Sequence, residues 1–371
     1  MTSTVSPGRP PFRADHIGSL LRPAALRRAF KAHASSSLGD EELRRIQDEA
    51  IRDVVKLQER CGLEVVTDGE FRRTSYWARF VGLTHGLEVR EAAFKFRDEH
   101  GHESEFTAPH VVARVRRRGD ITVDEYRFVR AITRATPKIT MPAPSTMHFW
   151  RGRHYADPGV YADPRAFFAD LGRVYREEIA ALAAAGARYV QLDEVALAML
   201  CDPAARDRVK ADGGDPEALV DLYVDAINEA VKDRPAGMAI GVHMCRGNYK
   251  GKYLSEGGYD SIAERLFQRA EVSHFLLEYD TPRAGDFAPL RLVPPNKGVV
   301  LGLVSSKRPE LEPLDLLRRR VDEATKFIAA ERLAISPQCG FASTIGGNPV
   351  TEADEVAKLA RCVEAARAIW G

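Results

Sequence analysis

Short apolar runs alternate with long stretches of helical periodicity along most of the 371-residue chain. Apolar runs of this length, separated by amphipathic stretches, predict β-strands that alternate with α-helices. We expect eight strands, at 14–19, 63–68, 138–143, 188–193, 238–244, 273–279, 298–304 and 333–337. This alternation favours an α/β fold, a (β/α)8 TIM barrel, over an open doubly wound sheet.

The amphipathic stretches between these runs predict the helices of the barrel. They lie at 40–61, 165–186, 215–233, 313–330 and 351–369. The second of them has clear boundary signals, because Asp163-Pro164 precedes its periodic positions and Gly186 follows them. The rhythm of strand and helix continues along the chain, so we expect a single barrel domain over residues 1–371.

Residues 86–136 depart from this rhythm. In EFTAPHVVARVRRRGDITVDEYRFVRAI, apolar and charged residues alternate around Arg118-Gly119-Asp120, which is typical of a β-hairpin. We therefore expect a hairpin insertion at about 86–136, between the second and third strands, that covers the barrel mouth or carries an oligomer contact. The arginines at 114–118 favour a solvated face over a binding patch.

Charge and cysteine content narrow the class of protein. The 54 Lys and Arg residues balance 53 Asp and Glu residues, which argues against nucleic acid or a membrane surface as partners. The first residues, MTSTVSPGRPPFRADHIGSL, contain no apolar signal-peptide core, so secretion is not expected. Five scattered cysteines predict reduced thiols in a cytoplasmic protein. This composition is compatible with a homo-oligomer.

Polar residues follow the expected strands at their carboxyl ends. In a barrel of parallel strands these ends meet at one mouth, where catalytic residues gather. Titratable groups at the end of a buried strand cost stability unless they are paired or bind a ligand. The sequence therefore predicts one shared polar site, formed by the strand ends at 16–19, 68–70, 193–194, 243–245, 278–280, 305–307 and 338–340.

Four of these residues, His243, Cys245, Glu278 and Cys339, are a suitable ligand set for zinc. Zinc binds imidazole, thiolate and carboxylate in a tetrahedron, and two sulfur ligands favour it over magnesium or calcium. A histidine and a cysteine two residues apart on a strand point to the same face. That pattern also suits two packed core side chains, since free cysteine is commonly buried. Spacing alone leaves both interpretations open.

Seven segments between residue 15 and about residue 345 carry a family resemblance: DHIGSLLRP, VVTDGEFRR, YVQLDEVALAML, VHMCRGNYKGKY, FLLEYDTPRAGDFAPLR, VVLGLVSSK and LAISPQCGFAST. With them the chain resembles the catalytic C-terminal barrel of the cobalamin-independent methionine synthase family, and most closely its stand-alone bacterial members. The resemblance implies a (β/α)8 barrel and a Zn2+ ion held by His243, Cys245, Glu278 and Cys339.

The resemblance also implies a substrate pocket and a reaction. Ile17, Gly18 and Ser19 would hold an amino-acid carboxylate, and Glu70 and Asp193 would receive its ammonium group. The implied reaction is methyl transfer from a folate or a methylcorrinoid to the thiol of homocysteine, which gives methionine. Structural alternatives exist, because Ser19 is also suited to cap the next helix and Glu70 to pair with a nearby arginine.

Two departures from the family pattern keep other activities open. Where the family has a histidine near the end of the seventh strand, this chain has Ser305 or Ser306, so Ser305 is the candidate catalytic residue there. Serine does not titrate near pH 7, so the proton is delivered differently or the reaction differs. The third-strand segment TMPAPSTMHFW is also altered.

The main alternative is a zinc-dependent thiol alkyltransferase that acts on another thiol and electrophile, similar to epoxyalkane:coenzyme M transferase. A barrel with a structural zinc and a decarboxylase of the same barrel type are further alternatives. A structural zinc site is coordinatively closed, whereas this ligand set includes an exchangeable carboxylate. Decarboxylation needs no thiolate site, so the cysteines count against it.

Overall fold

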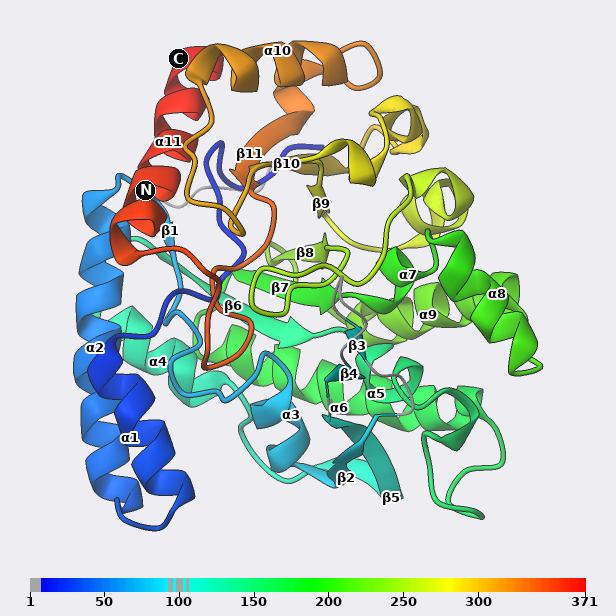
Figure 1. Cartoon of the computed structure of the whole chain (residues 1–371). Coiled ribbons are helices and arrows are strands. Elements are labelled where there is room, and N and C mark those ends of the chain that lie inside the picture. Colours follow the sequence, from blue (N-terminus) through cyan, green and yellow to red (C-terminus); the bar gives the residue numbers. More distant parts are fainter. Residues whose placement is uncertain (1–7, 93–95, 98–102, 105–106) are drawn as a thin grey trace.

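Seven parallel strands form one curled sheet in the computed structural model of the chain, which describes residues 8–92, 96–97, 103–104 and 107–371 (Figure 1). In order across the sheet they are β1 (Val65–Val66), β6 (Thr136–Pro142), β7 (Tyr189–Glu194), β8 (Ala239–Met244), β9 (His274–Glu278), β10 (Gly298–Val304) and β11 (Leu333–Pro337). The strands are buried almost throughout, as expected when helices cover a parallel sheet. Seven of the predicted strands are thus confirmed, although β1 has only two residues.

The prediction of a strand at 14–19 is wrong. In the described chain this segment forms a single parallel β-bridge, between Ala14 and Ile335 of β11, instead of a strand. The Asp15 amide donates to the Ile335 carbonyl at 2.9 Å, and the Leu20 amide donates to the Gly69 carbonyl at 3.1 Å. The segment therefore runs between β11 and the end of β1 as irregular chain. Side chains rather than a ladder must hold it there.

A buried ion pair anchors this irregular segment. Asp15 Oδ1 lies 2.7 Å from Lys138 Nζ on β6, and both side chains are fully buried. Lys138 also donates to Gln191 Oε1 at 2.9 Å, and the Tyr189 hydroxyl donates to Asp15 Oδ2 at 2.6 Å. Burial alone would raise the pKa of Asp15, but the lysine outweighs it and the pKa is lowered. The charged network thus ties segment 14–19 to β6 and β7.

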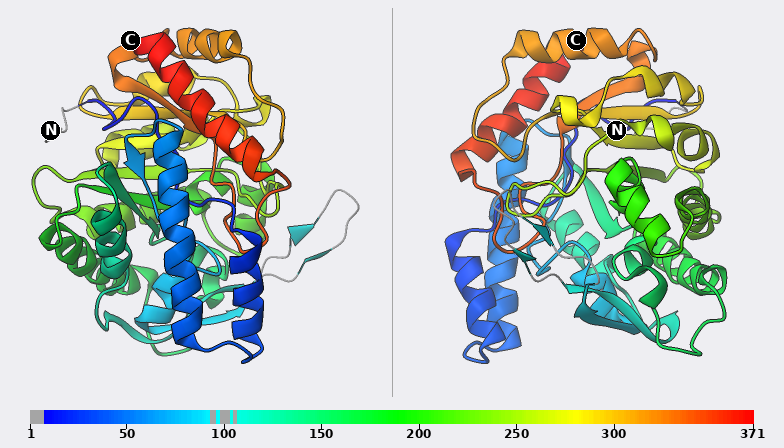
Figure 2. Two further views of the ribbon diagram at one scale, coloured as in Figure 1. Left: turned by 90° about the vertical axis from the view of Figure 1, so that its left-hand side faces the viewer. Right: turned by 45° about the vertical axis from the view of Figure 1, so that its right-hand side comes forward.

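The helices lie outside the sheet (Figure 1). The five predicted helices are confirmed as α2 (Asp40–Arg60), α6 (Pro164–Ala184), α9 (Pro216–Val231), α10 (Leu314–Ala324) and α11 (Glu352–Trp370). The Asp163 carboxylate caps α6 by accepting from the Ala166 amide at 2.9 Å, and Gly186 follows its end with φ of 100°. Figure 2 shows α11 close to α2, and their Leu359 and Ile51 belong to one apolar cluster.

Further helices were not among those predicted from the sequence. They are α1 (Ala24–Ala34), α3 (Ala78–Leu83), α4 (Val123–Ile132), α5 (Thr146–Phe149), α7 (Ala196–Met199) and α8 (Pro203–Ala211). A π-helical turn spans Glu264–Gln268, and 3-10 turns span Gly152–His154, Tyr259–Ser261, Pro282–Ala284, Ala288–Leu292 and Ala330–Arg332. Every helix in the described part of the chain is too short or too polar to span a lipid bilayer.

A β-hairpin lies between β1 and β6, as predicted. Its strands β2 (Thr84–Glu91) and β5 (Thr107–Arg117) are antiparallel, and β3 (Phe96–Arg97) pairs with β4 (Glu103–Ser104) between them. Arg118-Gly119-Asp120 is not its turn but follows β5, because the apolar residues after it recur at helical spacing and form α4. Arg114, Arg116 and Arg118 are exposed as expected, whereas Arg117 is partly buried and donates to the buried Glu178 at 2.8 Å.

The ion pair in the sheet interior gives a test of the fold. Lys138→Met would leave the Asp15 carboxylate buried without its counter-charge, so the free energy of unfolding should fall by roughly 3–5 kcal/mol. Urea denaturation measures this loss. The control is Lys232→Met, because Lys232 pairs with Glu229 at 2.6 Å while about half exposed, and surface pairs contribute at most about 1 kcal/mol. Equal losses in the two variants would contradict the anchoring role of Lys138.

Candidate functional site

Three side chains of ligand type converge at the carboxyl ends of the strands. His243 lies in β8, Cys245 directly follows β8 and Cys339 follows β11. Their ligand atoms all lie within 4.8 Å of one another, and the two sulfur atoms are 3.6 Å apart. Atoms that bind one tetrahedral zinc at about 2.0–2.3 Å are themselves about 3.3–3.8 Å apart. The spacing of the three residues therefore fits a shared metal ion.

The polar atoms of this cluster also fit a metal ion. Among the described residues, neither ring nitrogen of His243 has a hydrogen-bond partner, although the side chain is buried. A buried polar atom without a partner costs free energy, and coordination would remove that cost. A hydrogen bond from Cys339 lowers the pKa of Cys245 well below its usual value, while the same contact raises that of Cys339. One thiolate is thus favoured in the cluster.

Glu278, the fourth predicted ligand, ends β9 but lies outside this group of three. Its Oε2 accepts from the Arg246 amide at 2.7 Å, and its Oε1 accepts from Arg283 Nη2 at 2.8 Å. Burial would raise the pKa of Glu278, but Lys307 and the two arginines outweigh it and the pKa is lowered. Glu278 is therefore an ionised carboxylate, and its oxygens keep lone pairs for a further partner.

A cavity of about 60 Å3 adjoins the cluster. Four of the five residues predicted for the substrate pocket line it together with the three ligand-type residues: Ile17, Ser19, Glu70 and Asp193. Gly18 is not in this lining, and its carbonyl accepts from the Thr67 hydroxyl at 2.6 Å. The structure thus brings most of the predicted substrate pocket together with the cluster in one cavity.

Ser19 lies against the segment that carries Cys339. It does not cap α1, whose N-cap residue is Pro23. Its carbonyl accepts from the Phe341 amide at 2.9 Å. A Cβ atom at Gly340 would lie 1.9 Å from the Ser19 hydroxyl oxygen and 3.1 Å from the Ser19 carbonyl oxygen, so the two segments approach closely here. This close approach places Ser19 beside Cys339, the residue before Gly340.

Glu70 is held in an unusual backbone conformation beside the cavity. The Asp68 carboxylate accepts from the Glu70 amide at 2.8 Å, and Glu70 has φ of 61°, which is rare for residues other than glycine. Oε1 accepts from the Thr140 hydroxyl at 2.8 Å and lies 3.6 Å from Arg73 Nη1, whereas Oε2 has no partner in the described chain. The structure therefore shows a loose pairing with Arg73 and leaves one oxygen available.

Arg22 stabilises this conformation of Glu70. No role for this arginine was predicted from the sequence. Its Nη2 donates to the carbonyls of Glu70 and Arg73 at 2.9 and 2.8 Å. Its Nη1 donates to the carbonyls of Ala342 and Thr344, both at 3.0 Å. One buried guanidinium thus joins the loop after β1 to the loop after β11. The only sequence signal is an arginine beside the apolar pair of LLRP.

The side chain of Gln191, two residues earlier on β7, orients the Asp193 carboxylate. Gln191 Nε2 donates to Asp193 Oδ1 at 2.7 Å. The amide can point only this way, because its oxygen accepts from Lys138 and an ammonium group can only donate. Burial raises the pKa of Asp193 to about 7, and Glu70 contributes in the same direction against the opposing effect of His243. Two neighbouring carboxylates thus line the cavity.

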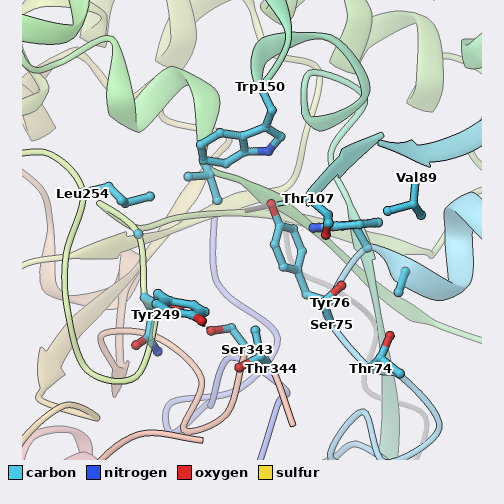
Figure 3. A pocket seen from close by; sticks show the side chains of 15 residues that line it. Thr74, Ser75, Tyr76, Val89, Thr107, Trp150, Tyr249, Leu254, Ser343 and Thr344 are labelled. Atoms are coloured by element: carbon cyan, nitrogen blue, oxygen red, sulfur yellow. Dashed lines mark hydrogen bonds between the residues drawn. The ribbon is translucent and has the colours of Figure 1, made fainter. Parts of the chain in front are cut away.

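A larger cavity of about 380 Å3 lies outside the small one and shares Tyr76, Val195, Asn248 and Ser343 with it (Figure 3). Trp150, which follows the third predicted strand, lies in its lining. The remaining lining residues are Thr74, Ser75, Trp77, Ala78, Val89, Thr107, Gly247, Tyr249, Leu254 and Thr344. Sequence reasoning missed Tyr76 and Asn248, although Tyr76 closely follows the segment VVTDGEFRR and Asn248 lies within VHMCRGNYKGKY.

Ser305 lies directly after β10, outside the linings of both cavities. Its amide donates to Glu312 Oε1 at 2.8 Å. No contact of the described residues tests its suggested role in catalysis, which stays a prediction.

Comparison with known proteins places this site in a family. A model of the cobalamin-independent synthase catalytic domain matches residues 12–368. The chain belongs to this family. The uncharacterized protein YxjH of Bacillus subtilis (strain 168) is 38% identical over 364 residues, which cover 97% of this chain and 95% of YxjH. A methionine synthase of Pyrococcus furiosus is 26% identical over 326 residues, which cover 88% and 85% of the two chains.

Solved structures agree with this membership. A Listeria monocytogenes protein, described as a candidate vitamin B12-independent methionine synthase, matches with a TM-score of 0.77 and 29% identity over 99% of both chains. A B12-independent methionine synthase of Shewanella sp. W3-18-1, in complex with selenomethionine, matches with a TM-score of 0.74 over 96% and 97% of the chains. Its identity of 22% supports the fold alone. The family resemblance inferred from the sequence motifs is confirmed.

The cysteine cluster gives a test of metal binding. Cys245→Ala or Cys339→Ala removes a sulfur ligand, so zinc content after loading and dialysis should fall sharply, as measured by mass spectrometry of the metal. Cys61→Ala and Cys201→Ala are the controls, because their sulfur atoms instead approach the carbonyls of Val356 and Leu197. If all four variants keep the same zinc content, the cluster is not the ligand set.

Proposed function

We propose that the protein is a zinc-dependent S-methyltransferase that transfers a methyl group to the thiol of homocysteine and forms methionine in the cytoplasm. One observation carries the proposal. The cluster of His243, Cys245 and Cys339 lines the same small cavity as the carboxylates of Glu70 and Asp193. We further propose that segment 14–19 completes the curled sheet as the eighth element of a (β/α)8 barrel.

His243, Cys245 and Cys339 would hold the zinc ion, with Glu278 as an exchangeable fourth ligand. When bound, zinc would supply the positive charge that keeps a substrate thiol deprotonated at neutral pH. Carboxylate is the hardest donor of the set, so Glu278 is the ligand that zinc holds least firmly. The Arg246 amide and Arg283 keep Glu278 ionised and beside the cluster.

The amino-acid end of homocysteine would lie between the irregular segment and the two carboxylates. Ile17, Gly18 and Ser19 would hold its carboxylate, while Glu70 and Asp193 would receive its ammonium group. Support comes from Glu70 Oε2, which no group of the described chain satisfies. Burial and the neighbouring Glu70 raise the pKa of Asp193, and a cation beside the two carboxylates would relieve that repulsion.

The outer cavity would admit the methyl-bearing end of the donor, which is a folate or a methylcorrinoid. In the transfer, the thiolate sulfur forms a bond to the methyl carbon while the bond from that carbon to the donor breaks. The electron pair of the broken bond stays with the donor. The two adjoining cavities would hold sulfur, carbon and leaving atom in line, which lowers the entropic part of the barrier.

A sulfonate thiol, the substrate expected of a coenzyme M-type alkyltransferase, is less well supported. It requires an available cation, and several arginines near the strand ends already have partners. Arg72 pairs with Asp48 at 2.6 Å and Arg73 pairs with Glu125 at 2.7 Å. Arg246 donates to the Gly257 carbonyl through both Nε and Nη2, at 2.8 and 2.6 Å. These arginines therefore stabilise the protein's own loops and carboxylates.

The acceptor assignment is tested by Asp193→Asn. Losing the carboxylate removes a charge-assisted hydrogen bond to the ammonium group, so kcat/KM for homocysteine should fall at least about tenfold. Zinc content should be unchanged. Asp225→Asn is the matched control, because Asp225 pairs with Arg269 on the surface. If the unmodified protein uses 2-mercaptoethanesulfonate better than homocysteine, the proposed acceptor is wrong.

A further inference from the structure

Glu278 lies outside the cluster of three ligand-type residues, although the backbone brings it to the same end of the sheet. In the parallel pairing of β8 with β9, Leu277 lies opposite Met244, so Glu278 and Cys245 follow at matching positions of adjacent strands. The Glu278 side chain is fully buried, so it does not turn out into solvent. Contacts of the carboxylate itself, rather than the course of its strand, must therefore keep it out of the cluster.

Two contacts hold the Glu278 carboxylate, one for each oxygen. Oε2 accepts from the Arg246 amide at 2.7 Å, and Oε1 accepts from Arg283 Nη2 at 2.8 Å. The first donor belongs to the backbone, whereas the second belongs to a charged side chain that is only 12% exposed. Of the two contacts, the one with Arg283 is therefore the one that the choice of side chain determines.

Arg283 is fixed in place by its surroundings. It lies in the 3-10 turn Pro282–Ala284, and its carbonyl accepts from the Gly257 amide at 3.0 Å. Its guanidinium packs over the Tyr253 ring, 4.2 Å from the ring centroid. Arg283 belongs to the lining of neither cavity. It can therefore act on the cluster through Glu278, but it does not reach a ligand in either cavity.

A guanidinium and a metal ion compete for the same carboxylate. The hydrogen bond from Arg283 uses a lone pair of Glu278, and the positive charge of the arginine attracts the carboxylate electrons that a metal would share. A zinc site with three protein ligands and one exchangeable position is of the catalytic type, whereas four protein ligands make a closed structural site. The contact with Arg283 thus decides which type of site the cluster forms.

We propose that Arg283 is a positioning residue, which draws Glu278 away from the metal and so keeps the fourth coordination position exchangeable for the sulfur of a thiol. The inference rests on the proposed function, because it requires a metal held by His243, Cys245 and Cys339. It adds to that function a determinant of thiol affinity that does not itself touch the thiol.

The test is Arg283→Met, which removes the charge and keeps an unbranched side chain. Protein loaded with Co2+ in place of zinc is titrated with homocysteine, and the sulfur-to-cobalt charge-transfer absorption gives the dissociation constant. In the variant Glu278 is free to bind the metal, so the dissociation constant should rise at least about tenfold, the effect of losing one charge-assisted hydrogen bond. Release of Co2+ to a chelator should be no faster than in the unmodified protein, whereas a merely structural role of Arg283 predicts faster release.

A second pair of variants isolates the route through Glu278. In a Glu278→Ala background, Arg283→Met should leave the dissociation constant unchanged, because the carboxylate on which the arginine acts is gone. This pair contains no buried carboxylate without its counter-charge, so it decides the question if Arg283→Met alone does not fold. Arg283→Lys should keep most of the affinity, because a positive charge and a hydrogen-bond donor remain.

Arg291→Met is the matched control, because Arg291 is exposed and donates to the Ala288 carbonyl at 2.9 Å. An unchanged dissociation constant in Arg283→Met, an equal loss with and without Glu278, or faster release of Co2+ overturns the inference and leaves the proposed function in place. If only 2-mercaptoethanesulfonate produces the charge-transfer band, the homocysteine assignment fails, and the same variants titrated with that thiol still test Arg283. If neither thiol produces the band in the unmodified protein, the proposed function is overturned together with the inference.

Discussion

The buried ion pair of Asp15 and Lys138 is the contact on which the site depends. Segment 14–19 lacks the ladder of hydrogen bonds that fixes a strand, so side chains must hold it. Lys138 donates to Asp15 and to Gln191, and Gln191 donates in turn to the Ile17 carbonyl at 2.6 Å and to Asp193. One ammonium group in the sheet interior therefore orients residues on both sides of the smaller cavity. This explains why a charge lies where a barrel normally packs branched apolar residues.

The cavity concentrates polar groups that each cost free energy when empty. Glu70 adopts left-handed backbone, Asp193 is a carboxylate with a raised pKa, and His243 has unsatisfied ring nitrogens within the described structure. Such costs persist only where the surroundings enforce them. Here Arg22 holds the Glu70 loop in place through four carbonyl groups, and Gln191 holds Asp193. The loops gain stability from this arginine, while the cavity keeps groups that a cation and a thiol-bearing ligand would satisfy.

Residue chemistry made much of this arrangement predictable. Apolar runs gave seven strands, and strand-end chemistry selected His243, Cys245 and Cys339, because the carboxyl ends of parallel strands must converge. The irregular course of segment 14–19 was not predictable, since its apolar pattern resembles a strand while distant side chains decide its path. Tyr76 and Asn248 were missed for a related reason. Their positions depend on contacts with the loop after β11, which forms only in the folded chain.

The contact between Ser19 and Gly340 joins segments from opposite ends of the chain. During synthesis on the ribosome, segment 14–19 emerges first, His243 and Cys245 follow, and Cys339 and Gly340 emerge last. Contacts of such long sequence separation form late, because the loop between them must close first. The nascent chain can therefore build much of its sheet while the smaller cavity is still absent. Assembly of the cavity therefore coincides with completion of the fold, so a half-made chain lacks the complete cluster of His243, Cys245 and Cys339.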